Sequence, residues 1–328
     1  MKSLMWISHR AGICAMRARC HCVRYLFTMV ILPVIAMWPA PTPVSANQSD
    51  GMPKVMRTGF LQRVFYETDP RDAKAAIEVQ AREVSHSLGL TTPPQVILYP
   101  DMPAMNDALR RGELELVTMP TIEYLRIRET VPLIPSFVAA NNNGLGVRYV
   151  IITRNDSGIR SLSDLQGKSI LLPPLSRHEL SHIWLEVLLL KAGKGETGRF
   201  FRQVKESPKL SHAVTGVFLR QADAAIVTRA GLDTSRQLNP QLETQLTVLA
   251  ESRNLSDGVT CLIPGTPEKF RNDLYKEIIR LNNTNGGRQM YTIFQSSGIT
   301  PFKPEHLEGL EELLRERNRL LAKQKRKP

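Results

Sequence analysis

The sequence predicts an α/β protein with two lobes, each built on a mixed, mostly parallel sheet with flanking helices. Two observations lead to this fold class. From Met52 onward, strand-like and helix-like segments alternate, and this order is typical of α/β units. At Ser161 the alternation begins again after a run of strands, so a second lobe is expected to be inserted into the first. A chain of 328 residues is long enough to give each lobe its own core.

The first lobe is expected to begin with an alternation of strands and amphipathic helices. The strands are expected at 55–61, 95–99, 114–119, 131–138 and 148–153, and the helices at 72–87 and 102–111. In the longer helix, Ala76, Ile77 and Val84 fall on one face, which indicates a helix that packs against the sheet.

The second lobe is expected to open with a short helix at 161–167, capped by Ser161 and ended by Gly167. A strand at 169–172 is broken by two prolines, and a helix at 178–192 follows. Further strands are expected at 202–205, 224–227 and 247–250, with a helix at 209–221. After the chain returns to the first lobe, a strand is expected at 258–263 and helices at 267–282, 286–296 and 304–323.

These patterns divide the chain into a leader and two interleaved lobes. Lobe I is expected at 47–153 and again at 250–328, and lobe II at 154–249, with hinges near Thr153 and at 250–253. The leader, 1–46, has the pattern of a secretory signal peptide. Five basic residues precede an apolar run at 25–38, and Val44-Ser45-Ala46 is a small-x-small cleavage site.

The signal peptide predicts export to the periplasm. Its apolar run is too short and too rich in proline for a membrane span. A signal peptide that starts at Met1 and one that starts at Met16 both have basic residues before the apolar run. The sequence therefore does not decide which methionine is the start. Cys261 is the only cysteine beyond this leader, and it lies in an apolar run at 259–263. We therefore expect no internal disulfide and a buried structural thiol.

The net charge of +12 does not indicate a nucleic-acid partner. Without residues 1–46 the net charge would be +7, and most of this surplus lies in the last fourteen residues, 315–328. A solvated basic tail after a helix explains that cluster, and it leaves the folded body nearly neutral.

Several stretches of sequence occur in an order that indicates a family. They are 109–116, 151–158 with its Arg-x-Asp-Ser-Gly, 161–168, 221–225 and 297–302. Together they resemble the phosphonate-binding branch of the periplasmic solute-binding proteins, which have the type II two-lobed fold. The resemblance implies a monomer that closes around a solute and presents it to the permease of an ABC transporter. It implies neither catalysis nor a cofactor. A membrane sensor in place of the transporter would fit the sequence equally well.

The solute is expected between the lobes, at the carboxyl ends of strands, where helix N-termini favour small oxyanions. Four segments reach this place: 62–66, 119–124, 174–178 and 228–229. From these segments we expect the ligand contacts Tyr66, Thr121, Tyr124, Ser176, Arg177, His178, Thr228 and Arg229.

One of these segments departs from the family pattern. Phosphonate-binding relatives carry a Ser-Thr-Ser type run where this chain has Ser176-Arg177-His178, so one hydroxyl is kept and an Arg is gained. A guanidinium offers a forked pair of donors to a carboxylate or a phosphonate. Relatives that hold an amino group place an acid where Thr228 stands. We therefore expect an anionic solute of the phosphonate, phosphate ester or carboxylate type. The alternative for Arg177 and Arg229 is a solvated surface side chain.

A second motif points to a different class of protein. His178-Glu179-Leu180-Ser181-His182 matches H-E-x-x-H, which on a helix can bind zinc with Glu179 as general base. The expected helix begins almost at His178, and no third ligand follows in a recognisable second motif. A zinc hydrolase using His178 and His182 therefore remains the alternative to a binding protein.

Overall fold

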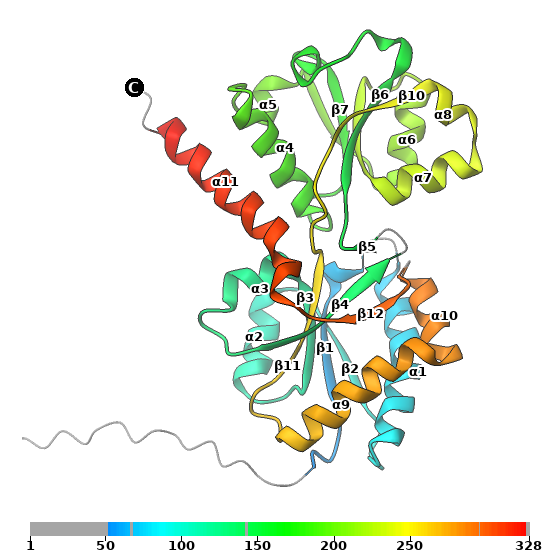
Figure 1. Cartoon of the computed structure of the whole chain (residues 1–328), viewed down its shortest axis with the longest axis vertical. Helices are drawn as coiled ribbons and strands as arrows, with labels where there is room; N and C mark the ends of the chain where they lie inside the picture. The colour runs from blue at the N-terminus through cyan, green and yellow to red at the C-terminus, as the bar shows by residue number, and fades with distance from the viewer. Residues whose placement is uncertain (1–51, 66–67, 142–143, 295, 326–328) are drawn as a thin grey trace, which may run out of the picture. The chain divides into compact units, whose positions relative to one another are not determined.

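The computed structural model describes residues 52–65, 68–141, 144–294 and 296–325, and it has two sheets (Figure 1). The first sheet has the order β12-β4-β11-β3-β1-β2, with β5 paired to β4. Its strands are β1 (Arg57–Leu61), β2 (Gln95–Tyr99), β3 (Leu116–Pro120), β4 (Ile134–Asn141), β5 (Gly144–Leu145), β11 (Gly258–Leu262) and β12 (Gly298–Pro301).

Parallel pairing in this sheet is restricted to β1 with β2 and β1 with β3, and the other pairs are antiparallel. The expectation of mostly parallel sheets is therefore wrong in this detail. The reason is the route of the chain. β11 begins opposite the last residue of β3, with Gly258 paired to Pro120. This is because the chain returns from the second lobe at the end of the sheet where β3 finishes. A strand that starts where its neighbour ends must run antiparallel to it.

The helices of the first lobe are α1 (Pro70–Ser87), α2 (Met102–Arg110), α3 (Thr121–Ile127), α9 (Glu268–Arg280) and α10 (Asn285–Ile293). Asp69 starts α1 by accepting a hydrogen bond from the Arg71 amide at 2.8 Å, and Pro70 occupies the first helical position. The buried face of α1 includes Ile77 and Val84, which join a core with α9 and α10. This core covers one face of the first sheet.

The second sheet has the order β10-β6-β9-β7-β8. Its strands are β6 (Tyr149–Arg154), β7 (Ser169–Leu172), β8 (Gln203–Glu206), β9 (Ala224–Thr228) and β10 (Leu246–Glu251), and its helices are α4 (Glu179–Lys191), α5 (Thr197–Phe200), α6 (Leu210–Phe218), α7 (Arg229–Leu238) and α8 (Gln241–Gln245). β7 pairs in parallel with β8 and β9, whereas β6 pairs antiparallel with β9 and β10. β6 and β9 are buried along almost their whole length, which explains their uninterrupted apolar sequences.

The chain leaves the first sheet earlier than the expected boundary near Thr153. β6 belongs to the second sheet, so the first crossing lies before Tyr149, whereas the return crossing follows β10 after Glu251. The two crossing segments pair with each other, because the Val147 amide donates to the Leu255 carbonyl at 2.7 Å and the reverse bond measures 2.9 Å. Gly146 has a φ of +79°, and a Cβ there would overlap the Leu255 backbone.

The last helix, α11 (Glu308–Lys325), links the lobes a third time. It follows β12 and the short 3₁₀ turn Pro304–Leu307, and it packs along α4 of the second lobe (Figure 1). Leu310 is fully buried in the same cluster as Trp184 of α4. Ion pairs join Lys191 to Glu316 at 2.8 Å and Glu186 to Arg317 at 2.6 Å.

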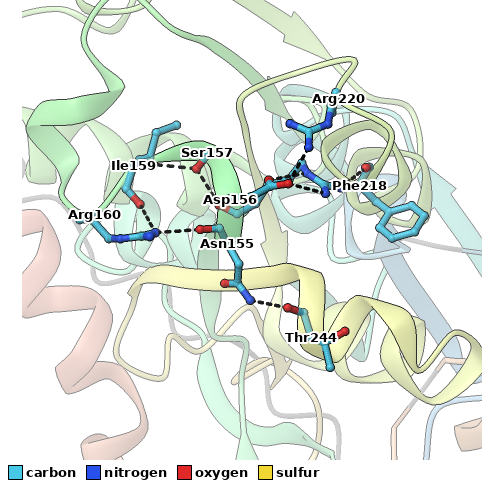
Figure 2. Close-up of polar contacts among 9 residues, drawn as sticks. Asn155, Asp156, Ser157, Ile159, Arg160, Phe218, Arg220 and Thr244 are labelled. Carbon is cyan, nitrogen blue, oxygen red and sulfur yellow. Dashed lines mark hydrogen bonds and ion pairs between the residues drawn. The ribbon is translucent and has the colours of Figure 1, made fainter.

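The Arg-x-Asp-Ser-Gly motif forms a tightly bonded turn after β6 (Figure 2). The Asp156 carboxylate accepts hydrogen bonds from Arg154 and Arg220, and the bond from Arg154 is the main cause that lowers its pKa to about 2. Asn155 donates to the Thr244 carbonyl and so ties the turn to the end of α8. This motif therefore lies at the end of β6 away from the lobe crossing, and its role is structural.

Within the described ranges, no helix combines the length and the apolar character that crossing a membrane requires. The expected signal peptide, 1–46, and the last three residues of the basic tail lie outside those ranges.

Candidate ligand-binding site

The ends of β3, β7 and β9 come together at the crossing between the sheets. The Thr121 amide, just after β3, donates to the Asp257 carbonyl of the return crossing at 3.2 Å. At the end of β9, Thr228 pairs with Tyr149 at the start of β6. The two sheets therefore bring the carboxyl ends of strands to one place, as expected for a ligand site.

A small crevice lies at this place, with walls from both lobes. Its volume is about 20 Å³, and it is lined by Arg63, Pro120, Ile122, Tyr149, Ser176, Arg177, Glu179, Leu180 and Asp257. This volume accommodates a water molecule but no larger solute. A solute can bind in it only if the two walls move apart.

The start of α4 supplies the second-lobe wall. The Pro174 carbonyl accepts hydrogen bonds from the Arg177 and His178 amides at 3.1 and 2.9 Å, which fixes the turn before the helix. His178 is the N-cap, with non-helical φ and ψ, and α4 begins at Glu179. Ser176 and Arg177 are exposed and lie at the rim of the crevice.

His178 is buried beneath this turn rather than exposed beside it. Its side chain is 5% exposed and meets the Tyr149 ring edge-on, with ring centroids 6.2 Å apart. Burial lowers the pKa of His178 to about 4, and electrostatic repulsion from the neighbouring His182 and Arg177 acts in the same direction. The imidazole is therefore neutral at neutral pH.

Glu179 belongs to a network of four charged side chains, Arg63, Glu123, Arg126 and Glu179, which we call the Glu179 network. Glu179 pairs with Arg126 at 2.5 Å and with Arg63 at 3.6 Å, and both arginines also pair with Glu123. The network joins α3 and the turn after β1 to the first turn of α4. Sequence reasoning missed it, because the partners are far apart in the chain and share no motif.

A larger cavity of about 1190 Å³ lies next to the crevice, and Tyr149 and Asp257 line both. Three of the expected ligand contacts, His178, Thr228 and Arg229, line this cavity. The Thr228 hydroxyl caps α7 by accepting from the Gly231 amide at 3.0 Å. Arg229 pairs with Glu251 at 3.1 Å and with Asp233 at 3.4 Å.

Two other expected contacts have their side chains in the protein interior. Thr121 is fully buried, and its hydroxyl lies 3.1 Å from that of Ser256. Tyr124 is 7% exposed and belongs to a first-lobe core cluster that includes Met105. Neither lines the two cavities, because α3, a helix that was not expected, begins at Thr121. Tyr66 lies outside the described residues.

In the described residues, the H-E-x-x-H side chains are not arranged as in a zinc site. His178 precedes the helix, so the two imidazoles are not on consecutive turns of one helix face. The His182 Nε2 atom lies 2.8 Å from the Pro173 carbonyl oxygen, and Glu179 is held by two arginines. Within the part of the chain that the structure covers, no three His, Cys, Asp or Glu side chains are grouped for a metal ion.

Two α/β lobes that are joined by crossing segments, with polar residues gathered where their strands end, define the class of type II periplasmic binding proteins. The sequence at 64–307 matches the family described as "ABC transporter, phosphonate, periplasmic substrate-binding protein". The chain belongs to this family, which confirms the expectation from the sequence motifs. The family consists of periplasmic proteins that bind a transporter's substrate.

Solved structures share this fold. XAC2383 from Xanthomonas citri, bound to ATP, is 16% identical with a TM-score of 0.61 over 82% of this chain and 99% of its own. A binding protein component of an ABC phosphonate transporter from Pseudomonas aeruginosa is 14% identical with a TM-score of 0.59 over 82% and 88%. PhnD1 from Prochlorococcus marinus, in complex with methylphosphonate, is 16% identical with a TM-score of 0.56 over 81% and 98%. No curated protein matches the sequence.

Proposed function

We propose that residues 47–328 capture a small anionic solute in the periplasm and deliver it to the permease of an ABC transporter. The observation that carries this proposal is the position of Ser176 and Arg177. Both are exposed at the start of α4, in a crevice whose opposite wall comes from the first lobe. A hydroxyl, a guanidinium and the first amides of a helix form a suitable set of donors for a phosphonate, a phosphate ester or a carboxylate.

The delivery step follows from the family, whose members bind the substrates of such transporters. The crevice itself does not hold a whole solute, and we propose that the lobes move apart to admit one and then close around it. Binding and closure require no bond to be made or broken. In this proposal the protein acts as a monomer, and residues 1–46 direct its export.

Isothermal titration calorimetry on purified residues 47–328 tests the proposal. The probes are methylphosphonate, inorganic phosphate and acetate, with methanol as the uncharged control. We expect at least one anion to bind and Arg177→Ala to weaken its binding by about tenfold or more, because a charge-assisted hydrogen bond contributes about 1.5–3 kcal/mol.

Arg199→Ala is the matched control. Its side chain is 85% exposed, its ion pair with Glu196 among the described residues is long at 3.8 Å, and it lines neither cavity. Binding should therefore match the parent protein. If no anion binds the parent protein, the proposal fails. If an anion binds equally well to the parent and to Arg177→Ala, Arg177 is not part of the site.

A further inference from the structure

The 1190 Å³ cavity is not confined to the crossing between the sheets. From Arg148 and Thr228 it continues into the first lobe, between the first sheet and helices α1, α9 and α10. Its inner walls are mainly apolar, with Met56, Phe60, Ile77, Val84, Leu274 and Ile278 among the lining residues. The full volume also includes an outer part along α7, lined by residues such as Ser235 and the exposed Leu238. The apolar lining of the inner part is typical of sites that enclose a largely apolar ligand.

The floor of the inner part is the centre of the first sheet. Thr118 of β3 and Thr260 of β11 are paired in register, and their hydroxyl oxygens lie 2.9 Å apart. Both side chains remain partly accessible, although helices cover this face of the sheet. Central strands under a helix layer are normally filled by packed side chains, so accessible threonines mark a gap in the packing.

Two residues that line this cavity each carry a polar atom that is buried away from the cavity space and has no partner among the described residues. These atoms are the Gln80 Oε1 atom on α1 and the Tyr291 hydroxyl on α10, in side chains that are 6% and 3% exposed. Gln80 is confined by the close approach of α10, because a Cβ on Gly286 would lie 2.7 Å from its Nε2 atom. Buried polar groups are normally satisfied, so a ligand with polar atoms of its own would relieve both if the two side chains turned slightly toward the cavity.

We propose that the solute is an amphiphilic anion whose apolar chain occupies the first-lobe cavity. This inference rests on the proposed function, which places the charged group at the start of α4. The cavity connects the two places, because it is lined by His178 and Arg229 at the crossing and by Ile77 and Val84 inside the lobe. A hydroxyl or carbonyl along the chain would pair with Tyr291, and a donor would pair with Gln80.

Titration calorimetry with n-alkylphosphonates of one, four and eight carbons, below their micelle concentrations, measures the contribution of the chain. Each methylene that becomes buried should tighten binding by up to about fourfold. The neutral fluorescent probe N-phenyl-1-naphthylamine reports on the apolar cavity without an anion. We expect octylphosphonate to bind at least tenfold more tightly than methylphosphonate and to displace the probe.

Cavity variants make the test specific. Ala81 of α1 lines the cavity, so Ala81→Phe should abolish the chain-length dependence and the probe signal while methylphosphonate binding is kept. Val79→Phe adds the same ring on the exposed side of α1 and should change neither. If Ala81→Phe does not fold, Gln80→Leu replaces it. By removing the unpaired oxygen, Gln80→Leu should keep probe binding and reduce any preference for polar groups along the chain.

The outcomes separate this inference from the proposed function. Equal affinity for methylphosphonate and octylphosphonate, without probe binding, overturns the inference and leaves the proposed function standing. If the probe and neutral octanol bind but no phosphonate does, the cavity binds apolar molecules and the solute is not an anion. That result overturns both the proposed function and the inference of an amphiphilic anion.

Discussion

His178 is a titratable group that folding transfers from water into the protein interior. Its pKa falls from the ordinary value of 6.5 to about 4, mainly through burial. Between these values the unfolded chain binds a proton that the folded chain does not bind. The free energy of unfolding should therefore decrease as the pH falls from about 6.5 to about 4, and His178 should contribute about 3 kcal/mol of this decrease.

Urea unfolding at several pH values measures this contribution. His178→Gln removes the titrating group, so its free energy of unfolding should fall less steeply over the same range. His212 is exposed on α6, and His212→Gln should retain the slope of the parent protein. Identical slopes for the parent and His178→Gln would show that His178 does not titrate in this way.

The site also shows which properties of single residues could be predicted from the sequence. Pro173-Pro174 indicated a turn before a helix, and Ser176 and Arg177 are indeed exposed there. The spacing of His178 and His182 suggested a zinc site, but the start of a helix decides whether i and i+4 share a face. α4 starts one residue after His178. Spacing alone does not contain that information.

At the scale of the elements, the Glu179 network is the polar link between α3 and α4. Its pairs are only partly buried, with side-chain exposures from 11% for Glu123 to 49% for Arg126. Partly exposed pairs contribute little, so we expect a coupling energy of about 0.3–1 kcal/mol between Arg126 and Glu179. The coupling should weaken in 0.5 M salt, because screening reduces interactions between accessible charges.

A double-mutant cycle with Arg126→Gln and Glu179→Gln measures this coupling from urea unfolding. The pair Lys74–Glu78 on α1 is the control, since it spans one turn of a single helix at 3.6 Å and joins no second element. Its coupling should be at the lower end of the range. A coupling near zero between Arg126 and Glu179 at low salt would mean that the network does not hold the two helices together.

Helices and strands were predicted correctly from the sequence where turn residues mark their ends. They were missed where they form only because of contacts with distant parts of the chain. β2 and β7 have the predicted bounds, Gln95–Tyr99 and Ser169–Leu172. α3 was missed because its sequence starts with a β-branched pair directly after a strand, and Ile122 is stabilised by a core that spans distant segments. α7 was missed because Gly231, which has a low helix propensity, lies in its first turn, although Thr228 is a good N-cap.

At the scale of the whole molecule, α11 connects the two lobes through its apolar face. Leu310 is fully buried in a cluster that includes Ile122 of α3 and Trp184 of α4. Truncation of such a leucine leaves a cavity, so Leu310→Ala should lower the free energy of unfolding by about 2–5 kcal/mol. Leu219→Ala is the control, since Leu219 is 55% exposed, and its effect should be within about 0.5 kcal/mol.

Equilibrium unfolding in urea compares the two leucine variants. A loss from Leu310→Ala no larger than that from Leu219→Ala would mean that α11 is not packed on α4 in solution. If the two lobes unfold separately in Leu310→Ala, a second transition should appear, and this would show that α11 couples the lobes.

The family and the two-lobed class could be predicted from the order of the elements, because strand and helix patterns are local. The sheet that each strand joins could not, and β6 shows why. Its sequence, Tyr-Val-Ile-Ile-Thr-Arg, is equally suited to either buried sheet, so only the crossing at Val147 assigns it to the second. The first-lobe cavity was also beyond sequence reasoning, since the residues around it are ordinary core residues.

The path of α11 has a practical consequence for measuring ligand capture. The last strand belongs to the first lobe, but the helix that follows is packed on the second, so a fluorescent protein fused beyond Lys325 would be attached to the second lobe. A dye on an exposed first-lobe residue such as Val79, replaced by Cys, would complete an energy-transfer pair. The buried Cys261 would not compete for the label, because burial keeps its thiol inaccessible and raises its pKa.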